Sequence, residues 1–175
     1  MDNNFFQCKT GMHFDSFDVD GVITREDFEQ LAQRFLTGIG FTRESSQGRS
    51  ILDGAGQFWD NLAQAADGDQ DGRITRQEFS KAVTDGPLGS PDDFAKAVRP
   101  WAEAVVQAAD VDGDGRLSTE EYRRMLGALS EGREAPREMA FTGGPVAVDV
   151  AIEAVQQFYA SGDPSHPTSR FFGQV

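Results

Sequence analysis

The fold of this 175-residue chain is decided by the stretch Asp67-Gly68-Asp69-Gln70-Asp71-Gly72-Arg73-Ile74-Thr75-Arg76-Gln77-Glu78. The same pattern returns in Asp110-Val111-Asp112-Gly113-Asp114-Gly115-Arg116-Leu117-Ser118-Thr119-Glu120-Glu121. Each stretch has aspartate at its first, third and fifth positions, glycine at the sixth, an aliphatic residue at the eighth and glutamate at the twelfth. Carboxylates crowded in this way repel one another unless a cation neutralises them. The repeat therefore predicts two sites for a metal ion, in segments that we call loop 2 (residues 67–78) and loop 3 (residues 110–121).

The spacing assigns a role to each position of these loops. Calcium takes six to eight oxygen ligands at about 2.3–2.6 Å, and the pattern is that of an EF-hand loop. We expect the aspartates and the final glutamate to bind through their side chains. The residue after the glycine should bind through its carbonyl while its side chain faces water, and Thr75 and Ser118, at the ninth position, should act through a water. The predicted calcium ligands are Asp67, Asp69, Asp71, Arg73 and Glu78 in loop 2, and Asp110, Asp112, Asp114, Arg116 and Glu121 in loop 3.

A less regular copy of the pattern, loop 1, covers residues 16–27. Ser16 stands at the first position, where aspartate is expected, while Asp18 and Asp20 keep the third and fifth positions. Val22 would bind through its carbonyl, and Asp27 replaces the longer glutamate at the twelfth position. With fewer carboxylate oxygens in reach, magnesium is an alternative occupant to calcium, because magnesium is smaller and octahedral. We expect loop 1 to bind a divalent ion, the alternative being an empty hand that only packs.

A fourth loop, loop 4, is predicted over residues 139–150, because hands usually pair through the residues at their eighth positions. Ile23 would pair with Ile74, and Leu117 with Val146. Loop 4 keeps glycine at its sixth position, but its ligand positions hold residues without side-chain oxygens: Met139, Phe141, Gly143 and Val150. The sequence therefore predicts a degenerate hand that retains only its packing role, with an ordinary turn before a C-terminal helix as the alternative.

Apolar residues at helical spacing flank the loops. Ser90 is predicted to cap a helix that begins at Pro91, and Pro100 should bend or break it. These features predict an all-α fold of four hands, in two paired lobes packed into one compact globule with a degenerate fourth hand. The expected divisions are residues 1–86 for hands 1 and 2, residues 90–160 for hands 3 and 4, and a tail of residues 161–175 that packs back on the body.

Composition excludes several classes of function. The net charge of −13 argues against nucleic-acid binding, which needs a basic surface. No apolar stretch approaches the roughly 18 residues that span a membrane, and the N-terminus does not read as a signal peptide. The single cysteine, Cys8, excludes an intramolecular disulfide and fits a reducing compartment. We therefore expect a cytoplasmic monomer.

The uneven spacing of the loops, with a long interval between Ser16 and Asp67, resembles the sarcoplasmic calcium-binding protein family and especially its bacterial calerythrin-like members. The resemblance rests on residues 14–28, on loops 2 and 3, and on the tail segments 158–164 and 171–173. It implies a compact helical protein with four hands, some of them inactive. Ser16 and the missing ligands of loop 4 depart from the family pattern.

Two roles for calcium binding compete. A buffer binds the ion and stays closed, whereas a sensor opens a hydrophobic surface to a target protein. Sensors of the calmodulin type favour methionine-rich grooves, but this chain has 4 methionines against 14 phenylalanines, which favours the buffer. We expect no enzyme, because His13 and His166, the 2 histidines, lie in no recognisable catalytic pattern. A photoprotein shares the helical scaffold, but its cavity would need placed histidines.

Overall fold

The computed structural model describes Phe14, residues 20–129 and residues 144–160, the last segment with side chains up to Gln156. This part of the chain is helical, with short strands at the loops, so the predicted all-α class is confirmed. The helices are α2 (Arg25–Ile39), α3 (Ser46–Ala66), α4 (Arg76–Thr84), α5 (Pro91–Ala109), α6 (Thr119–Leu129) and α7 (Val148–Ala160). The strands are β1 (Val22–Thr24), β2 (Arg73–Thr75), β3 (Arg116–Leu117) and β4 (Val146–Ala147). Among the described residues, no helix combines the length and apolar character that crossing a bilayer would need.

Helix α5 begins where the sequence predicts. The Ser90 side chain accepts a hydrogen bond from the backbone N–H of Asp93, and Pro91 occupies the first turn. Pro100 lies inside α5 without breaking it, contrary to the stronger form of the expectation. The carbonyl that loses its helical donor at a proline lies four residues earlier, at exposed Lys96, where water can satisfy it.

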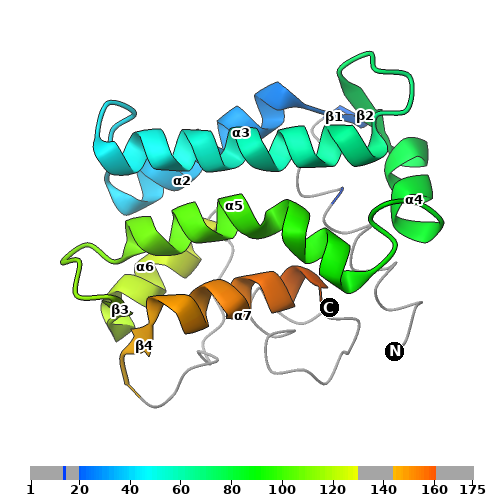
Figure 1. Cartoon of the computed structure of the whole chain (residues 1–175). Coiled ribbons are helices and arrows are strands. Elements are labelled where there is room, and N and C mark those ends of the chain that lie inside the picture. The colour runs from blue at the N-terminus through cyan, green and yellow to red at the C-terminus, as the bar shows by residue number, and fades with distance from the viewer. Residues whose placement is uncertain (1–13, 15–19, 130–143, 161–175) are drawn as a thin grey trace.

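Two short antiparallel pairs of strands join the loops. Strand β1 pairs with β2, placing Ile23 opposite Ile74, and β3 pairs with β4, placing Leu117 opposite Val146. Both predicted pairings are therefore confirmed, and all four side chains are buried. The two pairs lie at opposite ends of the molecule (Figure 1).

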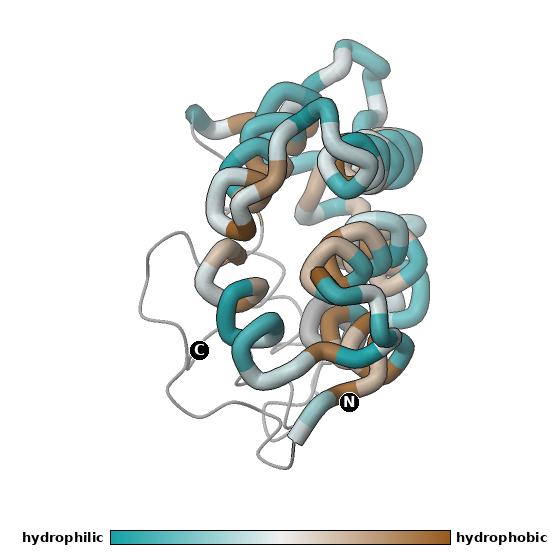
Figure 2. Tube along the Cα trace, turned by 90° about the vertical axis from the view of Figure 1, so that its left-hand side faces the viewer, coloured by the Kyte–Doolittle hydropathy of each residue, from teal (hydrophilic) through white to brown (hydrophobic). Residues whose placement is uncertain are grey.

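The helices enclose an aromatic core. Helix α3 packs along α5, α5 packs against α7, and α2 contacts both α3 and α6. Apolar segments of the tube lie between the helices, while hydrophilic residues lie mainly on the outside (Figure 2). Phe28 of α2 meets Phe58 of α3 edge to face at 4.9 Å between ring centroids. Phe35 of α2 meets Trp101 of α5 at 5.8 Å, so rings from the two halves of the chain share one core.

Two glycines allow the halves of the chain to approach closely. A Cβ placed on Gly54 of α3 would lie 2.7 Å from the Cβ of Ala104 and 2.8 Å from the carbonyl oxygen of Pro100, both in α5. A Cβ on Gly38 of α2 would lie 2.7 Å from the Cβ of Ala128 in α6. Atoms do not approach so closely, so glycine is required at both crossings. The predicted tail, residues 161–175, lies outside the described residues.

Candidate metal centre

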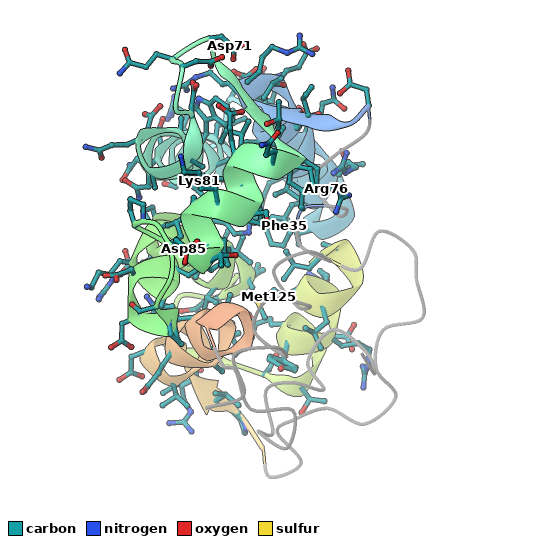
Figure 3. The ribbon with its side chains drawn as sticks, turned by 90° about the vertical axis from the view of Figure 1, so that its right-hand side faces the viewer. Phe35, Asp71, Arg76, Lys81, Asp85 and Met125 are labelled. Carbon is teal, nitrogen blue, oxygen red and sulfur yellow. The ribbon has the colours of Figure 1, made fainter. Side chains whose placement is uncertain are left out.

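Loop 2 connects α3 to α4 and gathers three carboxylates. Asp67 is the C-cap residue of α3, and one carboxylate oxygen each from Asp67, Asp69 and Asp71 lies within 4.8 Å of the others. Gly72, at φ 79°, supplies the sharp turn that brings the chain back toward α4. Asp71 lies at the outer end of the molecule, away from the buried side chains of Phe35 and Met125 (Figure 3). The three aspartates are thus brought together on the surface, as predicted.

Backbone hydrogen bonds hold these carboxylates in place. The N–H of Gly72 donates to Oδ2 of Asp67 at 3.0 Å, and the N–H of Arg73 donates to Oδ1 of Asp71 at 2.8 Å. The other oxygen of Asp67, Oδ1, is buried and has no hydrogen-bond partner among the described residues. A buried carboxylate oxygen without a partner costs free energy. A cation bound among the three carboxylates would remove that cost, so the residues present fit a metal ion.

Loop 3 repeats this arrangement between α5 and α6. Carboxylate oxygens of Asp110, Asp112 and Asp114 also lie within 4.8 Å of one another. The N–H of Gly115 donates to Oδ2 of Asp110 at 3.0 Å, and the N–H of Arg116 donates to Oδ1 of Asp114 at 2.8 Å. The two loops therefore form equivalent pre-arranged clusters of acidic oxygens.

The final glutamates close each loop. In loop 2, Oε1 of Glu78 accepts from the N–H of Gly68 at 3.2 Å, and Oε2 accepts from the N–H of Thr75 at 2.9 Å. In loop 3, Oε1 of Glu121 accepts from the N–H of Val111 at 2.9 Å, and Oε2 accepts from the N–H of Ser118 at 2.9 Å. Each glutamate thus reaches from the exiting helix back to the start of its loop.

These contacts lower the pKa of both glutamates. Hydrogen bonds from the backbone and the side chain of Thr75 are the largest cause that lowers the pKa of Glu78. For Glu121, burial acts to raise the pKa, but hydrogen bonds from Ser118, Val111 and Asp112 together outweigh it, and the pKa is also lowered. Both carboxylates are therefore charged at neutral pH, as a calcium ligand must be.

The ninth residues have a role that the prediction of a water contact missed. The hydroxyl of Thr75 accepts from the N–H of Glu78 at 3.3 Å, and the hydroxyl of Ser118 accepts from the N–H of Glu121 at 3.3 Å. Both residues therefore cap the helix that leaves the loop. The signal was present in the sequence, because Ser or Thr followed three residues later by Glu is a capping box.

Loops 1 and 4 are described only in part. Ser16 and Asp18 lie outside the described residues, whereas Asp20 is exposed and Val22 begins β1. Oδ2 of Asp27 accepts from the N–H of Thr24 at 2.8 Å, the same contact that Glu78 makes with its ninth residue. Met139, Phe141 and Gly143 of loop 4 lie outside the described residues, and Val150 is exposed on α7. A metal in loop 1 and a degenerate hand at loop 4 stay predictions.

One side chain of loop 3 differs from expectation. The guanidinium of Arg116 does not simply face water, because its Nη2 donates to the carbonyl oxygen of Pro145 at 2.8 Å. This contact crosses from loop 3 to loop 4, and no local sequence signal indicates it.

Comparisons with known proteins agree with this geometry. A model described as "EF hand" matches residues 64–83 and 103–126, which contain loops 2 and 3. No curated protein matches the chain. Among solved structures, a calcium-binding protein of Streptomyces coelicolor, described in terms of prokaryotic calcium-mediated regulation, is 28% identical, with a TM-score of 0.68 over 89% of this chain and 98% of that one.

Two more distant structures share the fold alone. A sarcoplasmic calcium-binding protein from amphioxus is 17% identical, with a TM-score of 0.65 over 98% of both chains. Calcium-loaded apo-aequorin from Aequorea victoria is 17% identical, with a TM-score of 0.68 over 93% of this chain and 94% of that one. With two acidic loops of matching geometry inside this fold, the chain carries two EF-hand calcium-binding motifs and is similar in structure to the sarcoplasmic calcium-binding proteins.

Proposed function

We propose that the chain binds one calcium ion in loop 2 and one in loop 3. The carrying observation is the convergence of three aspartate oxygens in each loop. The ligands of loop 2 are the carboxylates of Asp67, Asp69, Asp71 and Glu78 and the carbonyl of Arg73. In loop 3 the same roles belong to Asp110, Asp112, Asp114, Glu121 and the carbonyl of Arg116. In the described structure each final glutamate is hydrogen-bonded to its loop, and in the calcium-bound form both of its oxygens bind the ion.

We also propose a third divalent site in loop 1, with calcium or magnesium as its ion. Asp27 supports this proposal, because its contact with Thr24 repeats the contact of Glu78 with Thr75. The pairing of β1 with β2 supports a pair formed by hands 1 and 2, and the pairing of β3 with β4 supports the same for hands 3 and 4. The proposed four-hand arrangement gives residues 1–86 to the first pair and residues 90–160 to the second.

The role that these contacts support best is that of a calcium buffer in the cytoplasm. A buffer changes shape little on binding, and this core is fixed by interlocking rings such as Phe35 with Trp101 and by the close crossing at Gly54. Among the described residues, the exposed large hydrophobic side chains are Val111 and Val150. The described surface therefore offers little apolar area to a target protein.

A calcium sensor is the second candidate. It is favoured by the 28% identity to the S. coelicolor protein, whose structure is described in terms of calcium-mediated regulation. In that role, repulsion among the carboxylates of metal-free loops would loosen the helices, and calcium would restore them or expose a binding surface. Neither role includes catalysis.

One experiment separates these candidates. Calcium is titrated by calorimetry into chelator-stripped protein, with and without millimolar magnesium, while a dye reports exposed apolar surface. Two or three tight sites without a gain in dye fluorescence support the buffer. The same sites with a large calcium-dependent gain support the sensor, and the absence of any calcium binding would refute both.

A further inference from the structure

The contact between Arg116 and Pro145 joins two equivalent positions of the paired loops. Gly72, Gly115 and Gly144 all have positive φ, at 79°, 79° and 118°, and each is followed by a residue that enters or directly precedes a short strand. Those following residues are Arg73, Arg116 and Pro145. In loops 2 and 3 the proposed function uses their carbonyls as calcium ligands. In loop 4 the equivalent carbonyl, that of Pro145, instead accepts a hydrogen bond from a guanidinium.

We propose that Arg116 is a positioning residue for the calcium site of loop 3, held in place by the hydrogen bond from its guanidinium to the carbonyl oxygen of Pro145. The inference rests on the proposed calcium binding by loop 3. Arg116 then contacts both loops. Its carbonyl faces the ion in loop 3, and its guanidinium donates a hydrogen bond to the carbonyl oxygen of Pro145 in loop 4. Through this side-chain contact, the Arg116 peptide group, which supplies a ligand in loop 3, is attached to loop 4.

The backbone around Arg116 supports this role. Its N–H donates to Oδ1 of Asp114 at 2.8 Å, and the carbonyl of the preceding Gly115 accepts from the N–H of Val148 at 3.1 Å. The peptide groups on the N-terminal side of Arg116 are thus held by loop 3 and by the start of α7. The hydrogen bond from the Arg116 guanidinium to Pro145 is a third restraint on Arg116. Losing it should therefore loosen both the ligand carbonyl and the junction of β4 with α7.

Loop 2 offers a matched comparison within the same chain. Arg73 holds the same position in its loop, and its N–H makes the same 2.8 Å contact, with Oδ1 of Asp71. Among the described residues, however, its guanidinium has no hydrogen-bond partner, and Arg73 is exposed. The two arginines share backbone geometry and charge and differ in the side-chain contact.

For the replacement of Arg116, simple electrostatics and the proposed contact predict opposite changes in the calcium affinity of loop 3. Removing a positive charge beside a calcium site should strengthen calcium binding, because cations repel one another. Arg73→Gln, which keeps the ligand carbonyl and removes the charge, should therefore bind calcium in loop 2 slightly more tightly than the parent. Arg116→Gln also loses a restraint on a ligand, and should bind calcium in loop 3 about twofold to fivefold more weakly, the range of exposed charged contacts.

The test follows both loops in one titration of the full chain. The amides of Gly72 and Gly115 each donate to the first aspartate of their own loop at 3.0 Å, so their ¹⁵N-detected signals report loops 2 and 3 separately. Calcium is titrated into the parent and into Arg73→Gln, Arg116→Gln and Arg116→Lys. Hydrogen exchange of the Val148 amide is measured on the calcium-loaded forms.

We expect Arg116→Gln to weaken calcium binding by loop 3 but not by loop 2, and to speed hydrogen exchange of the Val148 amide. Unchanged calcium binding by loop 2 shows that the fold is intact. Arg116→Lys should fall between parent and Arg116→Gln, because it keeps the charge but not the planar donor group. If Arg116→Gln strengthens loop 3 or leaves it unchanged, the inference is overturned while the proposed function stands. A parent protein in which Gly115 does not respond to calcium would overturn the proposed function of loop 3 together with this inference.

Discussion

The replacement Glu121→Gln tests the assignment of loop 3 most directly. Glutamine has nearly the shape of glutamate and still fits a capping box, so α6 should begin at the same residue. What changes is the charge and one of the two acceptor atoms. Glu121 uses Oε1 to accept from the N–H of Val111 and Oε2 to accept from the N–H of Ser118. An amide NH₂ cannot accept either bond, and it cannot coordinate a cation.

The loss can be estimated from the charge. Two unit charges 4 Å apart interact by about 1 kcal/mol in water. A carboxylate about 2.4 Å from a doubly charged ion therefore contributes roughly 3 kcal/mol at the dielectric constant of water. Since 1.4 kcal/mol corresponds to a factor of ten, we expect Glu121→Gln to weaken calcium binding at loop 3 by about a hundredfold.

The neighbouring residue provides the control. Glu120 carries the same charge, but its Oε2 accepts from Nη1 of Arg123 at 2.6 Å and its side chain is 66% exposed. Salt screens exposed charges over about 8 Å, so Glu120→Gln should change the affinity by no more than about threefold. Calorimetry on chelator-stripped protein measures both variants. Equal effects of the two substitutions would refute the assignment of Glu121 as a ligand and leave only a general charge effect.

The described contacts support four further predictions. Glu78→Gln should weaken loop 2 as strongly as Glu121→Gln weakens loop 3, leaving one tight site in calorimetry. Gly54→Ala should lower the free energy of unfolding by about 1–3 kcal/mol, because its Cβ would lie 2.7 Å from that of Ala104. Gly127→Ala, whose Cβ would meet no atom of the described residues within 4 Å, should raise the free energy of unfolding by roughly 0.5–1 kcal/mol. If urea unfolding showed that both substitutions change the stability in the same direction, the close crossing at Gly54 would be contradicted. Because hydrogen bonds lower the pKa of both glutamates, their contribution to calcium affinity should persist as the pH falls to the ordinary pKa of a glutamate side chain and be lost only below it. A loss near pH 6 would contradict this.

The features that the sequence predicted depend on neighbours along the chain. Ligand spacing and the sixth-position glycine fixed the geometry of Asp67, Asp69 and Asp71, and hydrophobic eighth residues indicated the pairing of Ile23 with Ile74. These signals are local or repeat between loops, so they can be read without knowing how the helices pack. The start of α5 at Pro91 was predictable for the same reason.

The features that the sequence did not predict depend on contacts between distant segments. From the sequence alone, Gly54 indicates only a glycine that weakens its helix. The structure shows that α3 crosses α5 at this residue, which explains why a glycine is needed there. The side chain of Arg116 was expected to face water, because the seventh residue of such a loop binds the ion through its carbonyl. Its acceptor, Pro145, belongs to another loop and becomes its neighbour only when β3 pairs with β4.

The same packing limits what calcium can do to the molecule. Loop 2 follows directly from α3 and loop 3 from α5, and these two helices pack along each other (Figure 1). Any shift of α3 caused by an ion in loop 2 would have to slide past α5 at Gly54, where there is no room even for a Cβ atom. It would also disturb the edge-to-face contact of Phe58 with Phe28. Well-packed interfaces resist small continuous displacements, so a switch would need a second complete arrangement of these helices. The interlocked rings and the close crossing at Gly54 therefore support the proposed buffer over the sensor.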